Sequence, residues 1–264
     1  MKVFISADIE GCAGVTSWKE TILGEMEHFK ASEQMTLEVK AVCETLLENG
    51  VDEIVVKDAH DSGKNILFDM LPKNVKIIRQ WLGSPYSMVQ GLDATFDAAI
   101  FIGYHSAASM TGNPLSHTMN TIINKMMLND MICSEYLLHT YAAASLGVPV
   151  IMLSGDKMIC DWAESFNEGV VTAPMKEGVG DGVISLNRAD ALDMLKDRTK
   201  QALANIDNCH VTLPDRFDVS ISYNTHMSAL RASYYPGVKR IDAYKVSFSS
   251  ESLFDMLTTR MFII

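Results

Sequence analysis

The sequence lacks the cysteine pattern of a protein held together by disulfides. It has five cysteines in 264 residues, an odd number, and no two of them form a C-x-x-C pair. Disulfide-bonded domains usually carry an even set, and thiolate zinc sites need paired cysteines. Scattered cysteines are typical of reduced thiols, so we expect a cytoplasmic protein.

A long hydrophobic run is also missing. The chain begins with MKVFISADIE, in which a short apolar run is broken by Asp8, unlike a signal peptide. The most apolar later stretch, YAAASLGVPVIMLSG, is interrupted by glycine and proline and is too short to span a bilayer. We therefore expect no membrane partner.

An excess of positive charge is absent as well. Asp and Glu number 33 against 22 Lys and Arg, which gives a formal net charge of −11. An acidic surface attracts neither the phosphates of a nucleic acid nor an anionic membrane. We expect no nucleic-acid partner.

What the sequence does contain is a regular alternation of strands and helices. Apolar segments such as KVFISAD, VDEIVVKDAH, VKIIRQ, FDAAIFIGYH and VPVIMLSGD predict strands, and helical stretches lie between them. The longest predicted helix runs from about Thr21 to Glu48, before Gly50. Apolar strands separated by helices indicate a mostly parallel central sheet flanked by helices, an α/β fold.

The chain changes character near residue 208. The segments VTLPDRFDVSISYN, VKRIDAYKVSFSS and ESLFDMLTTRMFII predict a small α+β arrangement. We expect an α/β catalytic domain over residues 1–207, which carries the site described next, and a smaller α+β C-terminal unit over 208–264. Within the first domain, TIINKMMLND predicts extended structure, for which a hairpin is one arrangement. EGVGDG predicts a mobile loop, because it lacks the Lys-Ser/Thr of a phosphate-binding loop.

Polar side chains follow the predicted strands where each strand ends. Because ligands of open α/β sheets bind outside the carboxyl ends of the strands, we expect these side chains to converge at one edge. They are Asp8 and Glu10 after the first strand, Asp58 and His60 after the second, His105 after FDAAIFIGYH and Asp156 after VPVIMLSGD.

Such a cluster is typical of a metal site. Carboxylates packed together without a cation repel one another and must take up protons. With divalent cations they become ligands. A mixture of imidazole nitrogen and carboxylate oxygen, without paired thiolates, suits zinc or a similar first-row metal.

Two further candidates stand between the fourth strand and VPVIMLSGD. His117 lies in the loop LSHTM, and Glu135 lies near the start of the helix in ICSEYLLH. Each also has an ordinary structural role open to it, because a loop histidine often forms only hydrogen bonds and an acid in a first helical turn interacts with the helix dipole. Likewise, Asp8 alone could cap a turn, and a small buried thiol is the simpler role for Cys12.

The motifs SADIEG, VKDAH, GYHS, LSHTM and SEYLLHTYAA, in this order, resemble those of the D-aminopeptidases of the DppA type, the M55 family of metallopeptidases. The resemblance covers essentially the whole chain. It implies two zinc ions per subunit, bridged by Asp8. Of the other implied ligands, Glu10 and His60 hold one ion, and His105 and Glu135 hold the second.

The same resemblance implies a role for His117 and an activity. His117 matches the family's catalytic histidine, and the family removes the N-terminal residue from short peptides or amides, preferring D-amino acids such as D-Ala. A metal-activated water is the expected nucleophile. The family's members form ring-like decamers, so we expect a homo-oligomer. Ser134 and Ala59 stand where glycine and serine are usual in the family, and the implied ligand set is nevertheless complete.

Two alternative functions remain at this stage. Carboxylate–histidine sites with two metals also serve phosphoryl transfer, which makes a metal-dependent phosphoesterase the first alternative. The acidity of the chain and the lack of an Arg/Lys phosphate clamp near the motifs count against it. The second alternative is a non-catalytic protein that binds a metal or a peptide.

Overall fold

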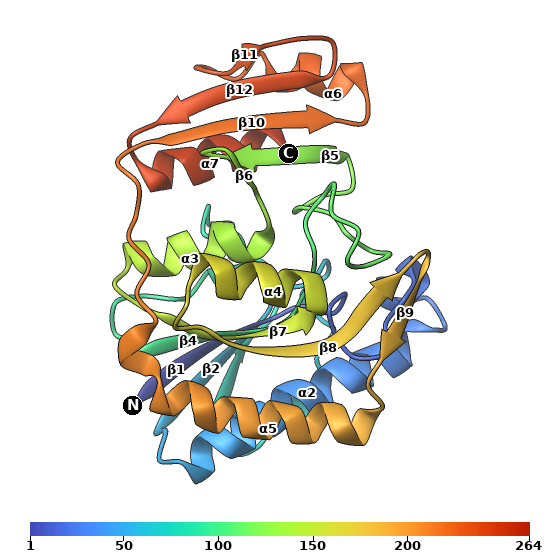
Figure 1. Cartoon of the computed structure of the whole chain (residues 1–264), viewed down its shortest axis with the longest axis vertical. Coiled ribbons are helices and arrows are strands. Elements are labelled where there is room, and N and C mark those ends of the chain that lie inside the picture. The colour runs from blue at the N-terminus through green and yellow to red at the C-terminus, as the bar shows by residue number, and fades with distance from the viewer.

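The computed structural model describes all 264 residues and contains two sheets (Figure 1). The larger sheet has the strand order β3-β2-β1-β4-β7-β8-β9, and every pair except β8–β9 is parallel. The predicted mostly parallel sheet is therefore confirmed. Its strands are β1 (Lys2–Ala7), β2 (Glu53–Asp58), β3 (Val75–Ile78), β4 (Ala98–Tyr104), β7 (Val150–Asp156), β8 (Val171–Val179) and β9 (Gly182–Ser185).

Helices cover both faces of this sheet, as its strands require. Successive strand residues point to opposite faces. In β1, Val3 and Ile5 pack in one core with α2 and α5, while Phe4 packs in the other core with α3 and α4. Figure 1 shows these helix pairs on either side of the sheet. Their bounds are α2 (His28–Glu48), α3 (Glu135–Ser145), α4 (Lys157–Phe166) and α5 (Arg188–Ala204).

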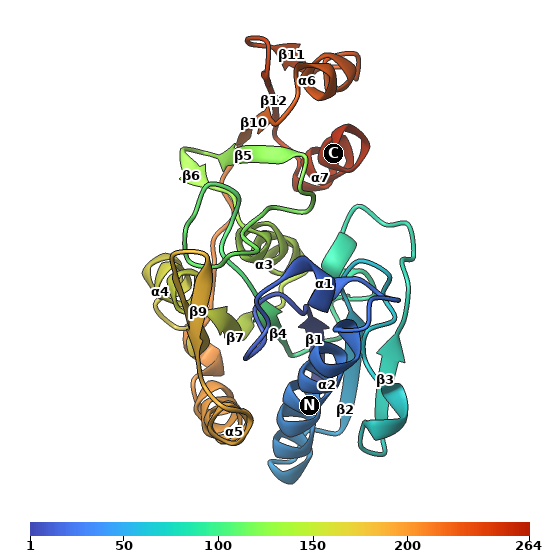
Figure 2. The same ribbon diagram turned by 90° about the vertical axis from the view of Figure 1, so that its right-hand side faces the viewer.

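The second sheet is antiparallel, with the order β11-β12-β10-β5-β6. Figure 2 shows it stacked beyond α3, on the side away from α2 and α5. Its apolar side chains belong to the same core as those of α3, so the two sheets share one hydrophobic cluster. Its elements are β5 (Ile123–Leu128), β6 (Met131–Ile132), β10 (Phe217–Tyr223), β11 (Lys239–Arg240) and β12 (Lys245–Ser250), together with α6 (His226–Ala232) and α7 (Leu253–Ile263).

The strands β5 and β6 come from the middle of the chain. The chain leaves the large sheet after β4 to form them, and β5 pairs both with β6 and with β10, which lies beyond residue 208. A hairpin of two strands is only marginally stable alone, and pairing with β10 gives it a sheet to join. We propose that the second unit consists of residues 208–264 together with this hairpin.

Local predictions differ from the structure at three points. The predicted helix from Thr21 to Glu48 is broken, because Gly24 has a φ of +103° and separates α2 from a short α1 (Trp18–Thr21). The ILFDML segment forms only a 3₁₀ turn, Phe68–Met70, and the other 3₁₀ turns are Ser87–Val89 and Ile206–Asn208. EGVGDG is the β8–β9 hairpin instead of a mobile loop. The extended structure expected for TIINKMMLND is confirmed as β5, which forms a hairpin with β6.

None of the helices combines the length and the apolar composition that crossing a bilayer requires.

Candidate metal centre

The centre lies at the carboxyl edge of the three neighbouring strands β2, β1 and β4. Strand β1 ends at Ala7, and the loop after it approaches the end of β4 closely, with Gly11 N donating to Gly103 O at 2.7 Å. A Cβ on Gly11 would lie 1.8 Å from the Tyr104 carbonyl oxygen, so only glycine allows this approach. The glycine of SADIEG thus brings the loop of Asp8 against the strand that ends before His105.

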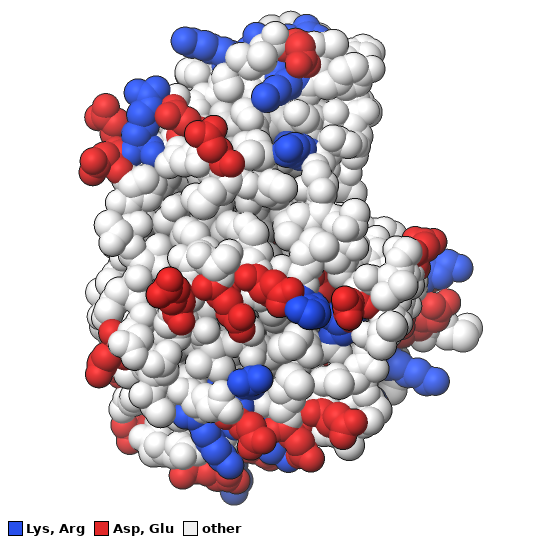
Figure 3. Space-filling view, in the orientation of Figure 1, with Lys and Arg blue, Asp and Glu red and all other residues white.

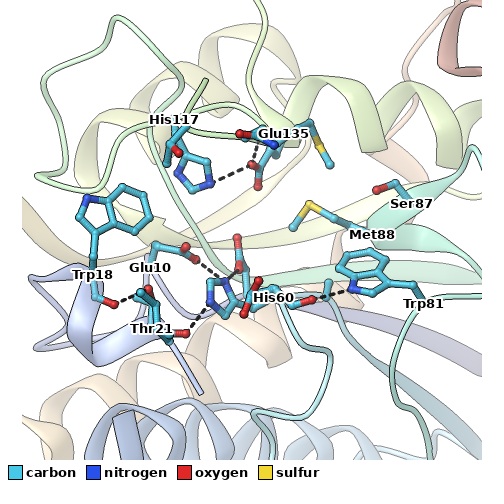
Figure 4. A pocket seen from close by; sticks show the side chains of 16 residues that line it. Glu10, Trp18, Thr21, His60, Trp81, Ser87, Met88, His117 and Glu135 are labelled. Atoms are coloured by element: carbon cyan, nitrogen blue, oxygen red, sulfur yellow. Dashed lines mark hydrogen bonds and ion pairs between the residues drawn. The ribbon is translucent and has the colours of Figure 1, made fainter. Parts of the chain in front are cut away.

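Five buried side chains from this edge and from α3 converge in space, and Figure 4 shows Glu10, His60 and Glu135 among them. His60 Nδ1 lies 3.0 Å from Glu10 Oε2 and 3.2 Å from Asp8 Oδ1. His105 Nε2 lies 3.3 Å from Glu135 Oε2 and 3.6 Å from Asp8 Oδ2. Asp8 therefore lies between the two halves of the cluster, with one carboxylate oxygen toward each.

Backbone carbonyls orient two of the histidines. His60 Nε2 lies 2.8 Å from the Thr21 carbonyl oxygen, and His105 Nδ1 lies 2.9 Å from that of Ser106. Because a carbonyl only accepts, these nitrogens carry the ring protons. The opposite nitrogen of each neutral ring then presents a lone pair to the carboxylates, which is the orientation of a metal-ligating histidine.

Glu135 is the first residue of α3, and the helix itself is capped by another side chain. Ser134 Oγ accepts a hydrogen bond from Leu137 N at 3.1 Å. The Glu135 carboxylate is therefore free to turn inward, where Oε1 accepts from Met119 N at 2.6 Å and Oε2 faces His105. The interaction of an acid with the helix dipole alone does not account for this placement.

His117 lies at the rim of the same cluster. Its ring stacks on His105, with centroids 4.3 Å apart, and Trp18 contacts it edge-on at 5.3 Å. Its Nδ1 donates to the Leu115 carbonyl at 2.8 Å, which leaves Nε2 unprotonated and 3.6 Å from Glu135 Oε1. His117 thus directs a free lone pair toward the centre.

The donor atoms fit a cation. Glu10 Oε2 and His105 Nε2 are buried without a hydrogen-bond partner, although His60 Nδ1 lies 3.0 Å from the first and Glu135 Oε2 lies 3.3 Å from the second. Buried polar atoms without partners are rare, and a bound cation would satisfy both. The side chains form three overlapping groups of possible ligands, with atoms within 4.8 Å of one another: Asp8, Glu10 and His60; Asp8, His105 and Glu135; Glu10, His105 and His117.

Electrostatics favour a cation as well. Burial, together with the charge of Glu10, raises the pKa of Asp8 well above its usual range. Burial also opposes the ionisation of Glu135, but the nearby His105 prevails and lowers the pKa of Glu135 to about 2. The negative charge of Glu135 in turn raises the pKa of His105 to about 10, although burial alone would lower it. The cluster must therefore hold extra protons unless divalent cations neutralise it.

Two strand-end acids do not join the cluster. Asp58 Oδ2 accepts from the backbone N–H groups of Asn65 and Ile66, at 2.6 and 2.8 Å. Asp156 caps α4 by accepting from Ile159 N at 3.0 Å. Both acids thus order the turns that follow their strands. Cys12 is a buried thiol that faces the backbone oxygen of Asp8.

Buried residues that the sequence reasoning missed support the loop of Glu10. The Lys176 ammonium donates to the carbonyl oxygens of Glu10 and Val15, and Asn113 Nδ2 donates to the Glu10 carbonyl at 2.9 Å. Glu38 Oε1 accepts from Ala13 N at 2.9 Å. The one available signal was a lysine among the apolar residues of β8.

The centre opens into a cavity of about 730 Å³. Figure 4 shows Trp18 beside His117 at one end of it, and Trp81 with Met88 at the other. Trp81 is held by a hydrogen bond from its Nε1 to the Asp61 carbonyl at 2.6 Å. No lysine or arginine lines this cavity.

Residues 1–262 match the family model Peptidase_M55, which describes D-aminopeptidases. The chain belongs to the M55 family. A D-aminopeptidase of Bacillus subtilis (strain 168) is 32% identical over 241 residues, which cover 90% of this chain and 87% of that protein. The predicted family membership is therefore confirmed.

Among solved structures, the M55 chain is similar to the Zn-dependent D-aminopeptidase DppA from Bacillus subtilis, described as a self-compartmentalizing protease. The TM-score is 0.94 and the sequence identity is 29%, over 100% of this chain and 96% of that one. The α/β fold with its second sheet is thus the fold of an M55 peptidase.

Proposed function

We propose that this protein is a zinc-dependent aminopeptidase that removes the N-terminal residue from short peptides or amides and prefers D-amino acids. The observation that carries the proposal is the buried cluster in which Glu10 Oε2 and His105 Nε2 lack hydrogen-bond partners at the bottom of an open cavity. Membership of the M55 family and the similarity to a Zn-dependent D-aminopeptidase support it.

Two zinc ions per subunit suit the division of the cluster. Asp8 directs one oxygen to each half, so it would be shared by both ions. Glu10 and His60 would complete one site, and His105 and Glu135 the other. When bound, the pair of ions would lower the pKa of a water molecule toward about 7 and polarise the scissile carbonyl group.

His117 would transfer the proton during the reaction. Burial lowers the pKa of His117 below its usual value, which favours the neutral ring at pH 7. Its Nδ1 carries the ring proton, because it donates to the Leu115 carbonyl, so Nε2 has a lone pair directed at the centre. It would take a proton from the attacking water and give it to the departing amine.

The acidic cavity would receive the free amino group of the substrate. Asp8, Glu10, Asp61 and Glu135 all line the cavity, and it contains no basic side chain other than histidine. Two zinc ions would balance the four carboxylates formally, so the ammonium group would be attracted locally by Asp61, the one acid of the cavity that is not a proposed ligand. Cleavage would then be limited to the first peptide bond.

The phosphoesterase alternative fits the site less well. A phosphoryl group needs cationic partners, but the cavity has no lysine or arginine in its wall. Figure 3 shows acidic side chains in a band across one face of the molecule, where α4 exposes Asp161 and Glu164. An anionic substrate would be repelled by such a surface.

We further propose a homo-oligomer, a ring-like decamer, in the cytoplasm. The similar solved protein is described as self-compartmentalizing, and all five cysteines are free and buried. Light scattering should then report about ten times the 29.2 kDa mass of one chain. A monomeric mass would contradict the proposed assembly.

The activity is tested by parallel assays of zinc-loaded protein with D-Ala-para-nitroanilide, L-Ala-para-nitroanilide and para-nitrophenyl phosphate. We expect hydrolysis of the D-anilide above the other two, and its loss with a chelator. Elemental analysis should find about two zinc equivalents per chain. Metal-loaded protein that cleaves only the phosphate ester would favour the alternative, and protein that cleaves none of the three would favour a binding role.

A further inference from the structure

A second cavity, of about 510 Å³, lies on the other side of His117. It shares Trp18, His117 and Thr121 with the cavity of the metal centre, and none of the five proposed ligands lines it. The indole of Trp18 contacts the His117 ring edge-on, with centroids 5.3 Å apart. The Trp18–His117 pair therefore forms a wall common to both cavities.

The two cavities differ in charge. The first contains carboxylates, whereas the second contains no aspartate, glutamate, lysine or arginine. The side chains found only in the second are small or uncharged, and its polar members are Ser109, Ser116, Asn124 and Asn224. A cationic amino terminus is thus favoured in the first cavity, and an uncharged peptide segment fits the second.

The second cavity also has unused hydrogen-bonding groups. Asn224 donates from Nδ2 to the Thr121 carbonyl at 2.8 Å, which leaves its Oδ1 as an acceptor. The carboxamide of Asn124 is exposed and makes no hydrogen bond within the protein. A carboxamide offers both a donor and an acceptor, which are the partners that a peptide C=O and N–H require.

A β-bulge in the second sheet places Asn124 beside the second cavity. The β5–β10 pairing passes from Lys125↔Ser222 to Ile123↔Tyr223, so Asn124 is an extra residue in the ladder. Such bulges redirect a side chain and recur next to active sites. The hairpin that leaves the large sheet after β4 thus supplies part of a surface beside the metal centre.

We propose that the second cavity binds the peptide segment on the leaving side of the scissile bond, with Asn124 and Asn224 contacting its backbone. The first cavity then holds the N-terminal residue, and the bond to be cleaved lies at the Trp18–His117 wall. This inference rests on the proposed function and extends it to substrate length. The protein should favour peptides with at least two residues after the cleaved bond over simple amides.

The test compares D-Ala-Gly-Gly amide with D-alaninamide, using kcat/KM for each. We expect the wild-type protein to prefer the longer substrate. Asn124→Ala removes the free carboxamide, and Asn224→Trp fills the cavity and removes the hydrogen bond to the Thr121 carbonyl. Each should lower the ratio of the two kcat/KM values by about tenfold. The control Gln201→Ala, on the exposed surface of α5, should keep the wild-type ratio.

The outcomes separate the inference from the function on which it rests. Cleavage of D-alaninamide with a ratio that both variants leave unchanged would overturn the inference and keep the proposed function. If neither substrate is cleaved, the proposed function fails. The binding of D-Ala-Gly-Gly amide to the purified protein then tests whether the second cavity binds a peptide. Isothermal titration calorimetry measures this binding in the wild type and in both variants. Equal affinity in wild type and both variants would then overturn it.

Discussion

At the scale of the residue, the three histidines of the centre owe their chemistry to hydrogen bonds on their outer side. Thr21, Ser106 and Leu115 each contribute a carbonyl that fixes one ring proton. The nitrogen facing the centre is therefore a lone-pair donor in each neutral ring. Two of these histidines are proposed ligands, and the third is the proposed catalytic residue.

His117→Ala should keep the zinc content and lose most of the turnover. The ring lies at the rim of the cluster, so its loss leaves the five proposed ligands in place, while proton transfer typically contributes about 10²–10⁴-fold. Elemental analysis and kcat on D-Ala-para-nitroanilide check both parts. His210→Ala, at an exposed position, is the matched control. A mutant with wild-type kcat would remove the role assigned to His117.

Lys57 should make stability depend on pH in the alkaline range. Burial lowers its pKa from 10.5 to about 8. Below pH 8 the amine is protonated in both states, and its burial disfavours folding. Between about pH 8 and 10.5 the unfolded state keeps a proton that the folded state has released, so the free energy of unfolding rises, by up to about 1.4 kcal/mol per pH unit.

Denaturant titrations across this pH range measure that rise. Lys57→Met should remove it, because no titrating group then remains at the position. Lys76→Met, at an exposed lysine of β3, should leave it unchanged. A slope that persists in Lys57→Met would assign the rise to other groups.

At the scale of the element, the loop after β1 depends on a contact from β8. The ammonium of Lys176 is buried and donates to the carbonyl oxygens of Glu10 and Val15, which lie more than 160 positions earlier in the chain. This cross-connection holds the backbone of one proposed ligand against the sheet. Loops that carry ligands need such support, because a misplaced ligand weakens the site.

Lys176→Met should therefore weaken zinc binding by about 10–100-fold, the usual effect of removing an outer partner of a metal ligand. Competition with a chromophoric chelator measures the affinity. The exposed Lys196 supplies the control Lys196→Met, for which we expect wild-type affinity. Unchanged affinity in Lys176→Met would show that Asn113 and the sheet hold the loop without the lysine.

At the scale of the whole molecule, the centre joins parts of the chain that are far apart in sequence. The ends of β1, β2 and β4 meet the start of α3 there, and α3 packs in the same core as the second sheet. A cation bound at this place would connect the large sheet to the layer between the two sheets. Metal binding would thereby be coupled to the stability of the fold.

Removal of zinc with a chelator should lower the melting temperature by about 10 °C, if the metal is present at about a thousand times its dissociation constant. The unfolded chain does not preserve the geometry of the cluster, so the ions stabilise the folded state selectively. Calorimetry before and after chelation, followed by zinc addition, measures the effect. An identical melting temperature with and without metal would contradict this coupling.

The sequence by itself determined the large sheet and the region of the site. Apolar strands separated by helices admit few arrangements, and parallel strands end at one edge, so Asp8, Glu10, His60 and His105 could be expected together. These inferences need only local periodicity and a general rule of topology. The family followed from the order of short motifs.

Only the tertiary structure decided which remaining residues reach that edge. Ser134 caps the helix, which leaves the Glu135 carboxylate free to turn inward. The carboxylates of Asp58 and Asp156 instead accept hydrogen bonds from nearby backbone N–H groups. The pairing of β5 with β10 and the burial of Lys176 against Glu10 also escaped the sequence. The pairing of β5 with β10 and the contact of Lys176 with Glu10 join distant segments of the chain, and local patterns carry no information about which distant groups will meet.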